Sequence, residues 1–160
     1  MGISNNDSNR GEAMIIDTDG ACAGNQFKNN SGGWGAVMRI NGQVEEISGG
    51  ERNTTNQRME ILACIRALET WGFPGAKLAL RSDSAYLVNC MHQKWYVRWR
   101  RNGWRNAKRQ PVENRDLWER LLELVESMEV RFTKVKGHSG DEWNERADAL
   151  ARRGMTECCG

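Results

Sequence analysis

Hydrophobic residues follow two different spacings along this chain, and the spacing separates strands from helices. Asn41-Gly42 stands between two apolar runs and is the strongest short hairpin signal, because both residues tolerate positive φ. Runs rich in aliphatic and β-branched residues, bounded by glycine or charged residues, predict strands at about 13–19, 33–40, 43–48, 77–82 and 129–135.

Elsewhere the apolar residues recur three or four positions apart, which predicts helices. Thr54 with Gln57, and Ser139 with Glu142, have the spacing of capping boxes that begin two of them. Helices are expected over about 54–71, for a few turns after Ser84, over about 94–101, over 116–127, and from Ser139 to about 153.

The order of these elements predicts the fold class. Three strands are followed by a helix, a strand, further helices, a strand and a last helix. This order is typical of an α/β protein with a five-stranded mixed sheet, in which an antiparallel three-strand meander is joined by parallel strands and helices flank both faces. In such sheets, ligands bind beyond the carboxyl ends of the central strands.

Composition fits one globular domain, which we place at residues 13–154. The chain has 160 residues, 39% of them hydrophobic and 28% charged. We expect a disordered polar leader at 1–12 and a flexible tail at 155–160. No run approaches the roughly 18 apolar residues of a membrane span, and the polar start does not resemble a secretory signal. The five cysteines are an odd number without zinc spacing, so we expect a cytoplasmic protein. We also expect a monomer without an obligate protein partner, because no long apolar surface is evident.

Positive charge is concentrated in one segment. The net charge is +2, yet residues 92–115 hold eight Lys or Arg and one acid, which gives that segment +7. Trp95, Trp99 and Trp104 are interleaved with the cations. Cations neutralise phosphates and indoles pack on sugars or bases, so the segment favours a nucleic-acid partner. The alternative is a solvated helix whose tryptophans, Trp99 above all, belong to the core.

Four acids from distant parts of the chain are candidates for one site. Asp19 and Asp83 follow two strand runs, Glu60 borders the apolar stripe of a helix, and Asp148 lies on the last helix. Two carboxylates about 5 Å apart repel by roughly 3 kcal/mol at an effective dielectric near 20, so their convergence calls for a cation. Oxygen ligands favour Mg²⁺ or Mn²⁺ over zinc. Taken singly, each acid is also compatible with a turn, a cap or a solvated helix face.

Four blocks of sequence resemble one family. "TDGACAGN", "NTTNQRMEI", "RSDSAYL" and "VKGHSGDEWNERADALA" resemble bacterial type 1 ribonuclease H in order and spacing, from about Ile15 to Arg153. The resemblance implies the ribonuclease H-like fold. It also implies endonucleolytic hydrolysis of the RNA strand of RNA–DNA hybrids, with 5′-phosphate and 3′-hydroxyl ends, as in primer removal and R-loop clearance.

The same resemblance implies a two-metal-ion mechanism, with two Mg²⁺ ions bound in the presence of substrate and Mn²⁺ as an alternative. His138, in the "KGH" of a loop, assists proton transfer or product release. Glu145 is an outer-shell acid that orients His138 or a metal-bound water. The metal-binding and catalytic acids carried over are Asp19, Glu60, Asp83 and Asp148.

Contacts with an RNA–DNA hybrid are implied as well. Residues 92–115 resemble the family's basic protrusion, which grips the DNA strand. The residues carried over are Lys94, Trp95, Arg98, Trp99, Arg101 and Trp104 in the protrusion, Cys22, Asn25, Asn56 and Gln57 at the minor groove, and Thr55 and Asn114 at a DNA phosphate.

The chain departs from the family pattern at Asp17, where an aromatic or apolar residue is usual. Asp17 lies two residues before Asp19 and therefore on the same strand face. One hypothesis is that it adds negative charge near the metals, and the other is that it pairs with a neighbouring Arg or Lys. Gln57, Ala85 and Asn53 also replace residues that are common in relatives.

Two other functions are compatible with these features. One is a non-catalytic module that binds RNA–DNA hybrids, and the other is a DNA-acting nuclease of the same fold. Four intact acids argue against the binding module, because a pure binder has no reason to place negative charge where phosphates dock.

Overall fold

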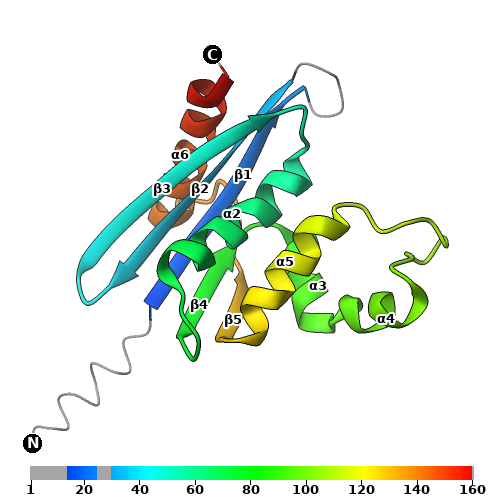
Figure 1. The fold of residues 1–160 in the computed structure, drawn as a ribbon. Helices are drawn as coiled ribbons and strands as arrows, with labels where there is room; N and C mark the ends of the chain where they lie inside the picture. The colour runs from blue at the N-terminus through cyan, green and yellow to red at the C-terminus, as the bar shows by residue number, and fades with distance from the viewer. Residues whose placement is uncertain (1–13, 25–29, 160) are drawn as a thin grey trace, which may run out of the picture.

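The strands form one mixed sheet. The computed structural model of the chain describes residues 14–24 and 30–159, so the predicted leader and Asn25 lie outside the described residues. The sheet order is β3-β2-β1-β4-β5 (Figure 1). The first three strands pair antiparallel, and β4 pairs parallel with β1 and β5, which confirms the predicted fold class. The strands are β1 Met14–Ala23, β2 Ser31–Ile40, β3 Gln43–Arg52, β4 Lys77–Ser82 and β5 Glu129–Lys134.

Helices cover both faces of the sheet. Helix α6 lies across β1, β2 and β3 on one face, while α2 packs on β1 and β2 from the other and contacts α5 (Figure 1). Across the described residues, no helix has the length and apolar character needed to cross a membrane. The helices are α2 Asn56–Trp71, α3 Ala85–Gln93, α4 Trp95–Asn102, α5 Arg115–Glu126 and α6 Glu142–Cys159.

The main hydrophobic core is shared by the sheet and the helices of the α2 face. Ile16, Ile61, Leu80 and Trp118 are among its fully buried members. A smaller cluster of Val37, Ala147 and Leu150 lies between β2 and α6. Two apolar layers therefore hold the central strands in place from both sides.

Strand β1 continues beyond Asp19, although the sequence suggested that Asp19 ends it. Strand β4 stops at Ser82, the partner of Thr18, whereas pairing of β1 with β2 continues to Ala23. Asp19 is therefore the first residue of β1 beyond the β4 pairing, and it lies at the level where Asp83 follows β4.

Two helix caps differ from the prediction. Thr55 rather than Thr54 caps α2, because its hydroxyl accepts the N–H of Arg58 at 3.1 Å. Asp141 rather than Ser139 caps α6, and its Oδ1 accepts the N–H groups of the second and third helical residues at 3.0 and 3.1 Å. Neighbouring polar residues compete for a cap, and only the path of the chain decides between them.

Helix α6 continues to Cys159, whereas a flexible tail was expected from residue 155. Its last turns lie directly on β2 and β3. A Cβ built on Gly154 would lie 2.0 Å from the carbonyl oxygen of Gly49, and one on Gly33 would lie 2.0 Å from that of Ala151. Glycine at these positions lets helix and sheet backbones touch, and this contact stabilises the extra turns.

Replacing Gly33 with alanine is expected to push α6 off the sheet. The added Cβ would meet backbone atoms of Ala151 and Met155 at 2.0 and 2.3 Å, and these cannot shift unless the helix moves. We expect the free energy of unfolding to fall by about 2 kcal/mol, measured by chemical denaturation. Gln43→Ala, at an exposed position of β3, should stay near wild type. A Gly33→Ala variant as stable as wild type would contradict the close packing of α6.

Candidate active site

Three carboxylates from distant segments meet beyond the end of β4. One oxygen each from Asp19 on β1, Glu60 on α2 and Asp83 after β4 lie within 4.8 Å of one another. Asp19 is buried, and the other two residues are half-buried. The structure therefore brings together three of the four acids that were singled out in the sequence.

The close approach of α2 to β1 brings Glu60 to this point. A Cβ built on Gly20 would lie 2.6 Å from the backbone nitrogen of Glu60, so glycine is required where the first turn of α2 crosses the strand beside Asp19. One helical turn further along, Thr18 Oγ1 lies 3.7 Å from Cys64 Sγ. Small side chains at the contact thus set the position of the acid.

Burial and mutual repulsion perturb the two innermost acids. Burial, followed by the charge of Asp83, raises the pKa of Asp19 to about 8. Burial, followed by the charges of Asp19 and Asp83, raises the pKa of Glu60 well above its ordinary value. Oε1 of Glu60 is buried and has no hydrogen-bond partner. An unpartnered carboxylate oxygen beside two further acids is costly unless a cation binds it, so this donor set fits a hard divalent ion.

Asp148, the fourth acid, lies at the edge of this cluster. It is half-buried on α6, and its hydrogen bond and charge contribute to the raised pKa of Asp19. Its Oδ2 also pairs with Arg152, one helical turn further on, at 3.2 Å. Asp148 is therefore close to Asp19 but is not one of the three acids that lie within 4.8 Å of one another.

His138 lies in an exposed loop that packs on Asp83. A Cβ built on Gly137 would lie 2.7 Å from Oδ2 of Asp83, so the loop backbone covers that carboxylate directly. The loop leaves β5 with the N–H of Val135 donating to the carbonyl of Ser82 at 2.9 Å. His138 itself has φ 55° and is exposed, one residue after Gly137.

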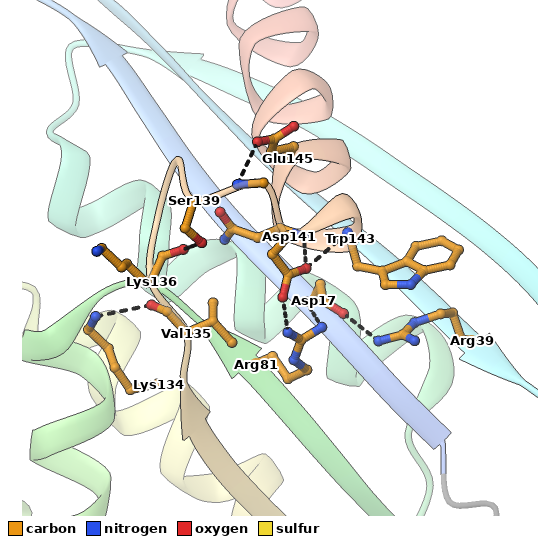
Figure 2. A network of polar contacts seen from close by, with 12 residues as sticks. Asp17, Arg39, Arg81, Lys134, Val135, Lys136, Ser139, Asp141, Trp143 and Glu145 are labelled. Carbon is orange, nitrogen blue, oxygen red and sulfur yellow. Dashed lines mark hydrogen bonds and ion pairs between the residues drawn. The ribbon is translucent and has the colours of Figure 1, made fainter.

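Glu145 holds the far end of the same loop. Its Oε2 accepts the N–H of Gly140 at 3.1 Å (Figure 2). The sequence suggested that Glu145 orients His138 or a water molecule. In the structure its carboxylate contacts the loop backbone, and its role toward His138 or a water molecule stays a prediction.

All of these residues lie within the part of the chain that matches a known family. Residues 11–156 match the RNase H family model. The chain belongs to the RNase H family. Ribonuclease H of Moorella thermoacetica is 53% identical over 139 residues, which cover 87% of this chain and 89% of that protein. Ribonuclease H of Syntrophomonas wolfei is 49% identical over 142 residues, or 89% of this chain and 95% of that protein.

Solved RNase H structures share the fold. LC9-RNase H1, a type 1 RNase H with the type 2 active-site motif, superposes with a TM-score of 0.79 at 28% identity, over 91% of this chain and 72% of that chain. LC11-RNase H1, solved in complex with an RNA/DNA hybrid, gives a TM-score of 0.68 at 23% identity, over 89% of this chain and 96% of that one. At that identity, the second match supports the fold alone.

Asp17, the departure from the RNase H pattern, is neutralised by two arginines. Its side chain is 1% exposed and accepts from Arg39 at 3.2 Å and from Arg81 at 2.9 Å. Burial raises its pKa, although both arginines oppose the shift. The pairing interpretation is therefore confirmed. The other hypothesis, that Asp17 adds negative charge near the metals, stays a prediction, although two arginines pair with its carboxylate.

Near the minor-groove residues of the RNase H pattern, a buried asparagine joins two turns. Asn30 donates to the carbonyls of Thr54 at 2.9 Å and Gly24 at 3.0 Å, and it accepts the N–H of Thr54 at 3.0 Å. Its Nδ2 also lies 3.3 Å from Sγ of Cys22. These bonds tie the end of β1 to the start of α2. Sequence reasoning missed Asn30 because an asparagine in a polar loop has no distinguishing pattern.

The residues assigned to a DNA phosphate lie around Arg58, a cation that the sequence analysis did not name. Arg58 Nη1 lies 3.4 Å from Oδ1 of Asn114, and its backbone N–H is bonded to Thr55. Glu51 and Asp116 also pair with this guanidinium, at 3.1 and 2.9 Å. Helix contacts between α2 and α5 bring these segments together.

The basic protrusion carries a groove of about 950 Å³. Among its lining residues are four exposed cations and one half-buried tryptophan. These are Lys94, Arg98, Arg101, Arg105 and Trp95.

The other two tryptophans of the protrusion are core residues. Trp99 and Trp104 are 7% and 6% exposed, and their ring centroids lie 5.7 Å apart. Trp99 also packs against Trp118, with the centroids at 5.8 Å. The structure agrees with the alternative interpretation, in which Trp99 is a core residue, and Trp104 is a core residue as well. Trp99 belongs to α4, and its contacts with Trp104 and Trp118 pack this helix onto the core, which leaves Trp95 as the most accessible indole of the three.

Removing the charge of Asp19 is expected to stabilise the metal-free protein at neutral and alkaline pH. The unfolded carboxyl ionises near 3.8 and the folded one near 8, so the folded state binds more protons in between. Wild-type stability therefore falls as pH rises through this window, whereas Asp19→Asn escapes that loss. Its advantage should reach about 2 kcal/mol by pH 8, or about 4–8 °C in Tm.

Thermal unfolding in EDTA from pH 4 to pH 9 checks this difference. Asp116→Asn is the matched control with the opposite sign, because the Arg58 hydrogen bond lowers the pKa of Asp116. That variant should be less stable than wild type above the ordinary pKa of an aspartate. Parallel curves for wild type and Asp19→Asn would contradict the raised pKa.

Proposed function

We propose that this chain is a metal-dependent endoribonuclease that hydrolyses the RNA strand of RNA–DNA hybrids and leaves 5′-phosphate and 3′-hydroxyl ends. One observation carries the proposal: Asp19, Glu60 and Asp83 meet within 4.8 Å in a chain of the RNase H family. Its bacterial relatives at 53% and 49% identity are ribonucleases H, which supports the reaction class.

Two Mg²⁺ ions, with Mn²⁺ as an alternative, suit this oxygen-rich donor set. Asp19, Glu60 and Asp83 would hold them, and Asp148 would join by giving up its contact with Arg152. Bound ions would supply charge neutralisation at the scissile phosphate and a more acidic water. The chain itself supplies placement, because β1, the end of β4 and α2 already bring Asp19, Asp83 and Glu60 together.

His138 would assist proton transfer or release of product. Two observations support this role: the neighbouring Gly137 lies directly on Asp83, and His138 is exposed. Imidazole exchanges protons near neutral pH, which suits both tasks. Glu145 would restrict the loop through its bond to Gly140.

Three surfaces are proposed to bind the hybrid. The groove of the protrusion offers Lys94, Arg98, Arg101, Arg105 and Trp95 to the DNA strand. Recognition of RNA requires contacts with the 2′-hydroxyl, which polar and backbone groups near Cys22, Asn25, Asn56 and Gln57 would supply. Thr55 and Asn114, around Arg58, would bind a DNA phosphate.

In the cell, we propose a cytoplasmic monomer that removes RNA primers and clears R-loops. Its substrate is the RNA–DNA hybrid itself, so the reaction calls for no obligate protein partner.

A cleavage assay tests the reaction and the acids together. Labelled RNA–DNA hybrid, double-stranded DNA and double-stranded RNA are incubated with Mg²⁺ or with EDTA. We expect cutting of the RNA in the hybrid alone, with none in EDTA. Glu60→Gln should lower kcat by roughly 100-fold or more, because a preorganised charge is lost. Asp83→Asn should also abolish cutting. Glu129→Gln, at the exposed start of β5, is the control and should cut normally.

The same assay separates the alternatives. Binding of the hybrid without cutting would support a non-catalytic module, and cutting of double-stranded DNA would support a DNA-acting nuclease. Either result would overturn the proposal.

Alanine at Arg98, Arg101 and Arg105 is expected to weaken substrate binding while leaving the chemistry intact. KM for the hybrid should rise with kcat little changed, and the salt dependence of log KM should flatten by about one unit for each lost phosphate contact. Alanine at Arg66, Arg120 and Arg153 removes the same charge from exposed positions outside the protrusion. An equal rise in KM for that control would show that net charge, not the groove, binds the substrate.

A further inference from the structure

One arginine joins the central strands to the start of α6. Arg81 Nη1 donates to Oδ2 of Asp17 at 2.9 Å, and Arg81 Nη2 donates to Oδ2 of Asp141 (Figure 2). Arg39 donates to the other oxygen of Asp17 at 3.2 Å. Two arginines and two aspartates therefore form a network whose charges cancel.

The network lies next to the acids of the site, two residues earlier along β1 and β4. Asp17 and Arg81 are partners in the parallel pairing of β1 and β4. Asp17 stands two residues before Asp19 on β1, and side chains two apart on a strand share a face. Arg81 stands two residues before Asp83, which directly follows β4. Arg81 thus joins the two strands, β1 and β4, that lead to Asp19 and Asp83.

Asp141 uses its two oxygens for two different purposes. Oδ1 caps α6 by accepting the N–H groups of Trp143 and Asn144, while Oδ2 accepts from Arg81. The first turn of α6 is therefore tied to β4 through one carboxylate. Two turns later the same helix carries Asp148, so the tie bears on the position of that acid.

The loop that carries His138 ends at the same carboxylate. It starts with the bond from Val135 to Ser82, and Ser139 donates to the carbonyl of Lys136 at 2.7 Å within it. Its far end is Asp141, held by Arg81 (Figure 2). Both ends of the loop are thereby attached to β4, the strand that precedes Asp83.

We infer that Arg81 is a positioning residue: its bridge between Asp17 and Asp141 sets the place of the His138 loop and of the start of α6 relative to Asp19 and Asp83. Stability alone is a weak reason for this bridge, because well-packed apolar residues often replace a buried ion pair without loss. A planar guanidinium that bonds to two carboxylates, in contrast, fixes the position of Asp141 relative to Asp17. The inference rests on the proposed function, since it assigns the bridge a role in that reaction.

Two variants break the bridge in different ways. Arg81→Met keeps the apolar stem and removes both bonds, whereas Asp141→Asn keeps the capping oxygen and removes the ion pair. The matched control is Arg146→Met, which removes an ion pair between the same helix and Glu46 on β3. Amide hydrogen exchange of the metal-free proteins over residues 135–148 is measured together with kcat, KM and the Mg²⁺ concentration at half-maximal rate.

Both bridge variants should exchange faster over 135–148 and should show kcat lower by about tenfold or more, because small displacements of catalytic groups are costly. KM for the hybrid should stay within about twofold, and the Mg²⁺ requirement should rise. The control should match wild type in loop exchange and kcat.

Wild-type exchange in both bridge variants would overturn the inference, whatever their activity. Faster exchange with a wild-type kcat would overturn it too, since the bridge would then be merely structural. If Arg81→Met does not fold, Asp141→Asn decides alone. A wild-type protein that leaves the hybrid uncut would refute the proposed function instead, while the exchange comparison would still judge whether the bridge fixes the loop.

Discussion

Repulsion between carboxylates in one partly buried place is the constraint on which the rest of this structure depends. Asp19, Glu60 and Asp83 lie close enough for burial and charge to raise the pKa of Asp19 to about 8. Such an arrangement lasts only if the surrounding chain cannot relax, because flexible acids would separate. The acids therefore stand on or next to rigid elements, and a bound divalent cation would relieve the repulsion between them.

Rigidity at this point comes from contacts between backbones. Glycine allows α2 to touch β1 beside Asp19, and glycines on β2, β3 and α6 let the last helix lie directly on the sheet. The ion network of Asp17, Arg39, Arg81 and Asp141 lies beneath the acids without adding net charge.

In the basic protrusion, cations and tryptophans are interleaved in the sequence but lie in different places in the structure. Its cations line an open groove, while Trp99 of α4 packs against Trp104 and Trp118 in the core. Aromatic packing makes a short helix stiff enough to present positive charge away from the sheet. The interleaved tryptophans and arginines therefore serve two purposes: the buried tryptophans belong to the core, and the exposed arginines line the groove.

The sequence by itself determined the order of the elements, the hairpin at Asn41-Gly42, the mixed sheet and the acids near the strand ends, because these follow from local periodicity and from short motifs. Tertiary structure decided the extension of β1 past Asp19, the choice of Thr55 and Asp141 as caps and the length of α6. It also decided that Asp17 is paired and that Asn30 joins two turns. Several of these outcomes depend on partners tens of residues away, such as Arg81 for Asp17 and Thr54 for Asn30. The pattern of residues within one segment does not predict which distant backbone or side chain will pack against that segment.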